Sequence, residues 1–188
     1  MRALRTTLIV LAGLLLAPLA PAQSLDAFVG LNALTASQAV QNIPRLGGGL
    51  FPSAGVNLFL GAVGVGGEVA FRATPNSSSL RPIYYDFNLL LDPFHISRSI
   101  VPELMVGLGA QTVRSYQGLA QCSGLGGCAS YASSHLSAHL GLAFKVYLTE
   151  HIFLRPEAHF YFIRNNQQFQ ASSAERFGVS LGYTLGGG

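Results

Sequence analysis

Apolar and polar residues alternate along much of this chain with a period of two. The clearest segment is 134–148, where every second residue is apolar: Leu136, Ala138, Leu140, Leu142, Phe144, Val146 and Leu148. The residues between them are mostly small, polar or charged. Successive side chains of a β-strand point to opposite faces, so this pattern predicts a strand with one apolar and one polar face.

Seven further segments show the same alternation. We predict strands at 25–34, 53–60, 63–72, 83–91, 102–113, 152–162 and 176–185. The break at Thr149-Glu150 is short and predicts a hairpin between 134–148 and 152–162. The connections alternate in length: those at 61–62, 92–99 and 149–150 are mostly short, whereas those at 35–51, 73–82, 114–133 and 164–175 are longer and more polar.

Such alternation fits either a soluble β-sandwich or a membrane β-barrel, and three features favour the barrel. The polar face is rich in Gly and Ala, which suits a narrow lumen. Strands of roughly ten residues can cross a bilayer at a tilt. Short turns at one end and long loops at the other are typical of outer-membrane barrels. The predicted fold class is all-β, an eight-stranded antiparallel up-and-down transmembrane β-barrel.

The N-terminal residues have the pattern of a secretory signal peptide. Arg2 and Arg5 precede an apolar run, and Ala20-Pro21-Ala22 offers small residues for cleavage after Ala22. The run is short and is interrupted by proline, which argues against a membrane helix. We predict a cleaved signal peptide at 1–22 and one barrel domain at 23–188, located in the cell outer membrane.

The charge of the chain argues against one class of partner. Charged residues make up 10% of the sequence, whereas a soluble protein has roughly 25%. Removal of Arg2 and Arg5 with the signal peptide leaves nine basic against eight acidic residues. Because there is no basic stripe and export is predicted, nucleic-acid binding has no support.

Three segments, 51–72, 150–156 and 176–183, resemble the small outer-membrane barrels related to the OmpA and OmpX transmembrane barrels. The resemblance implies eight antiparallel strands, periplasmic N- and C-termini, four surface loops, contact with outer-membrane lipids, and insertion by the barrel assembly machinery. The chain departs from such proteins because it ends on Gly188 rather than on an aromatic residue. The insertion signal is then either displaced to Tyr183 or read differently by the host.

Charged side chains in the strand interiors point into the predicted lumen. An eight-stranded barrel is only wide enough for side chains to fill, and an unpaired buried charge would cost several kcal/mol. Acidic and basic groups nearly cancel, which predicts a plug of paired charges with Arg155 at its centre. A gated ion path is the alternative. The predicted network is Glu68, Asp86, Glu103, Lys145, Arg155 and Glu157, with Arg72 and Arg176 nearer a rim.

Two inward histidines are candidate metal ligands. A turn over 148–150 would pair Tyr147 with His151 and place His139 opposite His159, with Glu157 nearby; a slip of two residues would place His139 opposite Tyr161. Two imidazoles and a carboxylate could hold zinc or copper. A hydrogen-bonded lumen network without metal is the favoured interpretation, and no cofactor is expected.

Two residue groups are assigned to the loops. Cys122 and Cys128 lie close together in a predicted loop of an exported chain, which favours a disulfide. Arginines gather near the loop ends of the strands, where they would either bind lipid phosphates and acidic glycans or merely solvate the loops. These rim candidates are Arg45, Arg72, Arg81, Arg114, Arg164 and Arg176.

No residue pattern predicts an enzyme. Ser134 and His135 are adjacent on a strand and therefore point to opposite faces, and no orienting carboxylate accompanies them. We predict an outer-membrane protein with a structural, envelope-integrity or surface-interaction role through its loops, whose partner the sequence does not name. A narrow channel for ions or small solutes is the alternative, and a lipid-modifying enzyme is the minor one.

Overall fold

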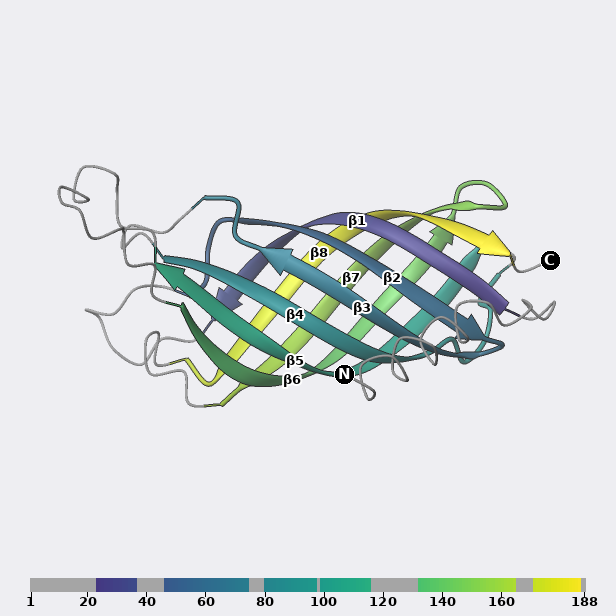
Figure 1. The fold of residues 1–188 in the computed structure, drawn as a ribbon. Helices are drawn as coiled ribbons and strands as arrows, with labels where there is room; N and C mark the ends of the chain where they lie inside the picture. The colour runs from purple at the N-terminus through teal and green to yellow at the C-terminus, as the bar shows by residue number, and fades with distance from the viewer. Residues whose placement is uncertain are drawn as a thin grey trace, which may run out of the picture.

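The computed structural model describes residues 23–36, 46–74, 80–97, 99–115, 132–164 and 171–186. These residues form eight antiparallel strands, and β1 pairs with β8 to close the sheet into a barrel (Figure 1). None of them forms a helix that is long and apolar enough to cross a membrane. The strands are β1 (Gln23–Ala36), β2 (Leu50–Leu60), β3 (Val63–Phe71), β4 (Leu80–Leu91), β5 (Ile100–Ser115), β6 (Ala132–Tyr147), β7 (Ile152–Ile163) and β8 (Ser173–Gly186).

The predicted eight-stranded all-β barrel is confirmed. Several strands begin earlier than the alternation indicates: β2 begins at Leu50, β4 at Leu80 and β8 at Ser173. In these added stretches polarity no longer alternates regularly, but backbone pairing continues, for example between Leu80 and Ser115. The pattern therefore marks the part of each strand that has two different faces, and the strand itself is longer.

The two ends of the barrel differ. Short connections at 61–62, 92–99 and 148–151 lie at one end, which we call the turn end. Gly61 starts the first of these turns with a φ of 67°, a left-handed conformation that favours glycine. Ser24 pairs with Gly186, so β1 begins and β8 ends at the turn end (Figure 1). The opposite end, which receives the longer connections, is the loop end.

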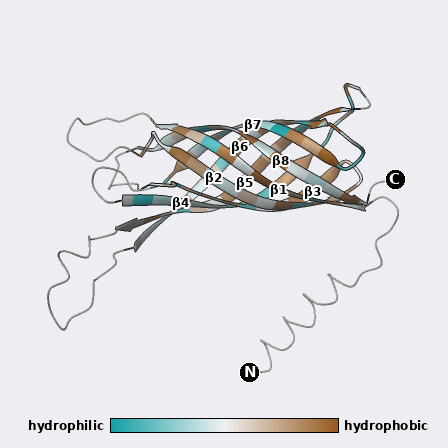
Figure 2. Ribbon diagram, turned by 90° about the horizontal axis from the view of Figure 1, so that it is seen from above, coloured by the Kyte–Doolittle hydropathy of each residue, from teal (hydrophilic) through white to brown (hydrophobic). Residues whose placement is uncertain are grey.

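The outer face of the barrel is apolar. Val29, Phe87 and Leu108 keep 61%, 64% and 63% of their surface exposed, and large hydrophobic side chains on all eight strands are similarly exposed. Hydrophobic and hydrophilic residues alternate along the strands, as Figure 2 shows. Apolar surface left in water costs about 25 cal/mol per Å², so a band of this kind needs an apolar surrounding.

Glycine on the inner face makes room for larger neighbours. A Cβ atom at Gly64 would lie 2.8 Å from Phe59 Cδ1, and one at Gly141 would lie 2.9 Å from Met105 Cε. Distances this short require a neighbouring side chain to move. The Gly-rich inner face therefore belongs to a crowded lumen, as the sequence predicts.

An apolar cluster closes the lumen near the loop end. Tyr84 and Tyr161 form its centre, with ring centroids 5.0 Å apart, and Phe51 packs edge-on against Tyr84. All members are buried: Leu34, Leu46, Phe51, Ala70, Tyr84, Val113, Tyr161, Ile163, Ala171 and Ala174. We call these residues the loop-end cluster.

The hairpin between β6 and β7 has a different register from the favoured prediction. Tyr147 pairs with Phe153 rather than His151, and His139 pairs with Tyr161 rather than His159. Thr149 Oγ1 accepts hydrogen bonds from the backbone N–H groups of His151 and Ile152, and this cap holds the four-residue connection 148–151. The observed register is the alternative shifted by two residues, in which His139 lies opposite Tyr161.

Candidate functional site: the charged lumen

Eight charged side chains point into the lumen and are buried. Alternation sets their direction, because each takes the inward position of its strand. They come from β1 (Asp26), β3 (Glu68), β4 (Asp86), β5 (Glu103), β6 (Lys145), β7 (Arg155 and Glu157) and β8 (Arg176). Together they form a chain of ion pairs that runs from the turn end toward the loop-end cluster.

Lys145 organises the turn-end part of this chain. Its Nζ atom lies 3.2 Å from Asp26 Oδ2, 2.6 Å from Asp92 Oδ2 and 3.5 Å from Glu103 Oε2. It also lies 4.0 Å from the centre of the Phe59 ring. Asp92 follows β4 and is partly buried, which raises the pKa of its carboxyl group above the ordinary value, while Lys145 opposes that shift.

Arg155 occupies the middle of the lumen. Its guanidinium lies 2.7 Å from Glu157 Oε2, 3.5 Å from Glu103 Oε1 and 4.0 Å from Glu68 Oε2. The same group lies over the Phe28 ring, 4.1 Å from its centre. Glu103 thus links Arg155 to the lysine, and Glu68 links it to the next arginine.

Arg176 is buried in the lumen and does not lie on the outer rim where its place in the sequence puts it. Its Nη2 atom lies 2.8 Å from Glu68 Oε1, and its Nη1 atom lies 3.9 Å from Asp86 Oδ2. The reason is that β8 begins at Ser173, so residue 176 is already inside the barrel. Asp86 also accepts a hydrogen bond from the Tyr161 hydroxyl at 2.7 Å.

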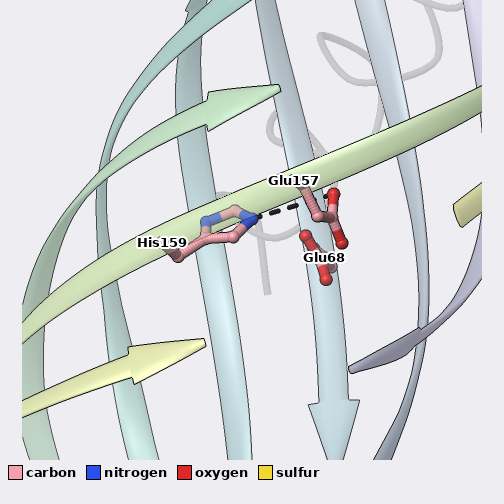
Figure 3. A group of neighbouring side chains, drawn as sticks. All are labelled: Glu68, Glu157 and His159. Atoms are coloured by element: carbon pink, nitrogen blue, oxygen red, sulfur yellow. Dashed lines mark ion pairs between the residues drawn. The ribbon is translucent and has the colours of Figure 1, made fainter. Parts of the chain in front are cut away.

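The two inward histidines lie diagonally across β6 and β7, with ring centroids 5.4 Å apart. His139 Nδ1 lies 3.7 Å from Asp86, and His159 Nε2 lies 3.8 Å from Glu157 Oε2. Neither ring has a hydrogen-bond partner among the described residues. Within the part of the chain that the structure describes, the group with metal-ligand spacing is Glu68, Glu157 and His159 (Figure 3). The group predicted from the sequence has His139 in place of Glu68; the structure brings Glu68, and not His139, to Glu157 and His159.

Acidic groups outnumber basic groups in the described lumen. Five buried carboxylates, on Asp26, Glu68, Asp86, Glu103 and Glu157, face three buried cations, on Lys145, Arg155 and Arg176. The expected near-cancellation is wrong, because Asp26 joins the network and the partly exposed Arg72 makes no ion pair there. With neutral histidines the described lumen carries an excess of two negative charges.

A cavity of about 620 Å³ opens at the turn end. Lys145 and Asp92 line its inner part, and Tyr147, Thr149 and Thr184 contribute polar groups around it. The lumen is therefore open to solvent at the turn end and filled by side chains toward the loop end.

The remaining candidates are dispersed. Arg164 is exposed, Arg72 and Arg81 are partly exposed near the loop end, and Arg81 donates a hydrogen bond to Ala73 O. Arg114 lies on β5, and its side chain is outside what the structure describes. Arg45, Cys122 and Cys128 lie outside the described residues, so the disulfide stays a prediction, as does the signal peptide.

The serine and histidine considered for catalysis lie beside different hydroxyl groups. Ser134 Oγ lies 2.9 Å from Thr112 Oγ1, whereas His135 Nε2 lies 3.2 Å from Ser133 Oγ. The pairing follows strand geometry, because residues two apart share a face and adjacent residues do not.

The barrel is similar to solved structures of outer-membrane proteins. The N-terminal barrel of Pseudomonas aeruginosa OprF superposes with a TM-score of 0.60 at 11% identity over 86% of this chain and 97% of that one. Neisserial surface protein A gives 0.61 at 10% identity over 87% and 96%. Yersinia pestis Ail, in complex with the heparin analogue sucrose octasulfate, gives 0.51 at 11% over 87% and 97%.

No family model and no curated protein sequence matches the chain. At identities this low the likeness is one of fold. The predicted resemblance to the small outer-membrane barrels is confirmed at that level: this chain has the fold of an eight-stranded outer-membrane barrel.

Proposed function

We propose that this protein is an integral outer-membrane barrel with a structural or surface-interaction role in the cell envelope. The apolar outer face supports a location in lipid, since Val29, Phe87 and Leu108 would otherwise be exposed to water. The fold shared with outer-membrane barrels supports the same membrane. In this proposal the turn end is periplasmic, the loop end faces outward, and the barrel assembly machinery inserts the chain.

The observation that carries the structural role is the filled lumen. A solute would have to pass the ion pairs around Arg155 and Arg176 and then the loop-end cluster. Separating buried pairs leaves charges without partners, at a cost of several kcal/mol each. The barrel is therefore an anchor that holds loops at the surface, and no catalytic step is assigned to it.

Conductance measurements test this proposal. The purified protein, folded in detergent, is expected to show the heat-modifiable gel shift of a membrane barrel. After reconstitution into planar bilayers it is expected to give no steady openings, because the lumen is filled. A folded barrel that conducts steadily would overturn the plug and establish the channel. A lipid-modifying enzyme would instead change the lipid composition of cells that overproduce it.

The turn-end cavity favours the channel as the second candidate. Lys145 lines this cavity and forms ion pairs with three carboxylates, those of Asp26, Asp92 and Glu103. Exchange of lysine among these carboxylates is the kind of step that a gate requires. The same conductance record separates the two candidates.

Arginines at the loop end provide a surface for acidic lipid or glycan groups. Arg72, Arg81 and Arg164 lie near that end with at least part of each residue exposed. Guanidinium groups suit phosphate and sulfate because they donate two parallel hydrogen bonds. The heparin analogue in the Ail structure gives a chemical precedent on a barrel of the same fold.

A sulfated glycan fragment tests this surface. The double variant Arg72→Gln, Arg164→Gln is expected to bind it several-fold more weakly at low salt, and the difference should shrink at high salt because exposed charges are screened. Glu175→Gln, which removes an exposed acid near the same end, should not weaken binding. Equal affinity of the wild type and the double variant would leave these arginines as solvating groups only.

A further inference from the structure

We propose that Glu68, Glu157 and His159 form a binding site for a divalent transition-metal ion of the zinc type inside the lumen. One ligand atom from each residue lies within 4.8 Å of the others, and all three side chains are buried (Figure 3). Zinc takes carboxylate oxygen and imidazole nitrogen at about 2.0–2.2 Å. Modest movement of the side chains would bring all three atoms onto one ion.

His159 supplies the observation that points to a ligand. Its side chain is fully buried, and neither ring nitrogen has a hydrogen-bond partner among the described residues. Glu157 Oε2 lies 3.8 Å from Nε2, which is beyond hydrogen-bond distance. Buried polar groups are almost always satisfied. An ion between Nε2 and the carboxylates would satisfy this imidazole.

The carboxylates of Glu157 and Glu68 are held in place by neighbouring arginine and serine side chains. Arg155 contacts Glu157 at 2.7 Å, Ser180 donates a hydrogen bond to the other oxygen of Glu157, and Arg176 contacts Glu68 at 2.8 Å. Outer partners of this kind orient metal ligands and keep carboxylates ionised. Each carboxylate oxygen has a second lone pair that remains available to an ion.

Charge balance also favours an ion here. The two arginines would repel a dication, but each is shared with a further carboxylate: Arg155 with Glu103 at 3.5 Å and Arg176 with Asp86 at 3.9 Å. The described lumen holds five buried carboxylates and three buried cations. One divalent ion would bring the buried charge to zero.

The ligand set selects the class of metal. Calcium and magnesium take oxygen ligands, whereas an imidazole with two carboxylates suits zinc and its neighbours. The ion would also connect opposite walls, because Glu68 lies on β3 and the other two ligands lie on β7, four strands away in the closed barrel. An ion that binds the folded barrel and not the unfolded chain would raise the stability of the barrel.

Refolding with zinc tests the site. The barrel is unfolded in urea, refolded in detergent with Zn²⁺ present so that access is not limiting, and dialysed to count bound metal. We expect one zinc per wild-type barrel, a higher urea midpoint than in a metal-chelated sample, and no comparable effect of Ca²⁺. His159→Gln should weaken binding by at least tenfold, while the matched lumen variant His139→Gln should retain it.

Two results would overturn the proposal. One is wild-type protein that refolds without taking up zinc; the other is uptake by His159→Gln equal to that of the wild type. If His159→Gln does not fold, X-ray absorption of zinc-loaded wild-type protein decides. A first shell with one imidazole nitrogen and the rest oxygen supports the site, whereas two or more imidazoles would place the ion elsewhere and refute it.

Discussion

Replacement of Arg155 by alanine is expected to destabilise the folded barrel by about 3–5 kcal/mol, measured as a lower urea midpoint in detergent. The guanidinium contacts three carboxylates and lies over Phe28, so its removal takes away both charge pairing and packing. A buried carboxylate that loses its cation bears its desolvation cost without compensation. An unchanged midpoint would show that Arg155 is not the centre of the network.

The structure identifies which carboxylate is left without a cation. Without Arg155, Glu103 still has Lys145 at 3.5 Å and Glu68 still has Arg176 at 2.8 Å. Among the described residues, Glu157 then has no cation within ion-pair distance and keeps a hydrogen bond from Ser180 and the ring of His159 at 3.8 Å. The double variant Arg155→Ala, Glu157→Gln should therefore recover much of the lost stability, because no lone charge remains.

A matched double variant sharpens this test. Arg155→Ala with Glu103→Gln should recover less, since Glu103 already has a second cation and its loss would leave Lys145 with fewer acidic partners. Under the channel alternative the single Arg155→Ala change should leave the midpoint nearly intact and raise conductance. Measuring both quantities on the same protein separates plug from pore.

The strands and their faces could be predicted because the alternation is sustained. From Leu136 to Leu148 each outward position is apolar, and the structure buries Ser137, His139, Ala143 and Lys145 on the other face. One lipid-facing side therefore fixes the direction of every side chain in the strand. The same rule predicts that Arg155, Glu157 and Glu103 point inward, where the structure places them.

The register of the β6–β7 hairpin could not be predicted in the same way. A shift of two residues leaves every side chain on its original face, so the pattern is identical in both registers. In the observed register, the side chain of Thr149 caps the four-residue connection 148–151. The register decides whether His139 lies opposite His159 or Tyr161.

Contacts across the lumen could not be predicted from the sequence either. Arg176 meets Glu68 and Asp86 on β3 and β4, strands far from β8 in sequence. The sequence places Arg176 too near the rim because the first residues of β8 do not alternate clearly. The grouping of Glu68 with Glu157 and His159 likewise depends on closure of the barrel, which brings β3 and β7 to face each other.

Replacement of Leu142 by arginine is expected to block insertion or to cost about 2–4 kcal/mol of folding free energy in lipid vesicles. Leu142 is exposed on the outer face and pairs with Leu104 and Ala158. It lies midway along the outward apolar positions from Leu136 to Leu148. A charge at that depth faces hydrocarbon on every side that the barrel does not cover.

Two control variants isolate the effect of depth from that of substitution. Leu185→Arg makes the same change on the same outer face close to the turn end, where the cost should fall to roughly 0–1 kcal/mol because the side chain reaches the interface. Leu142→Phe keeps the site apolar and should insert normally. Gly141 is unsuitable as an inward control, because a side chain there meets Met105 and His159. Equal folding of Leu142→Arg and Leu185→Arg would show that Leu142 does not face the middle of a bilayer, and the membrane location of this face would then be wrong.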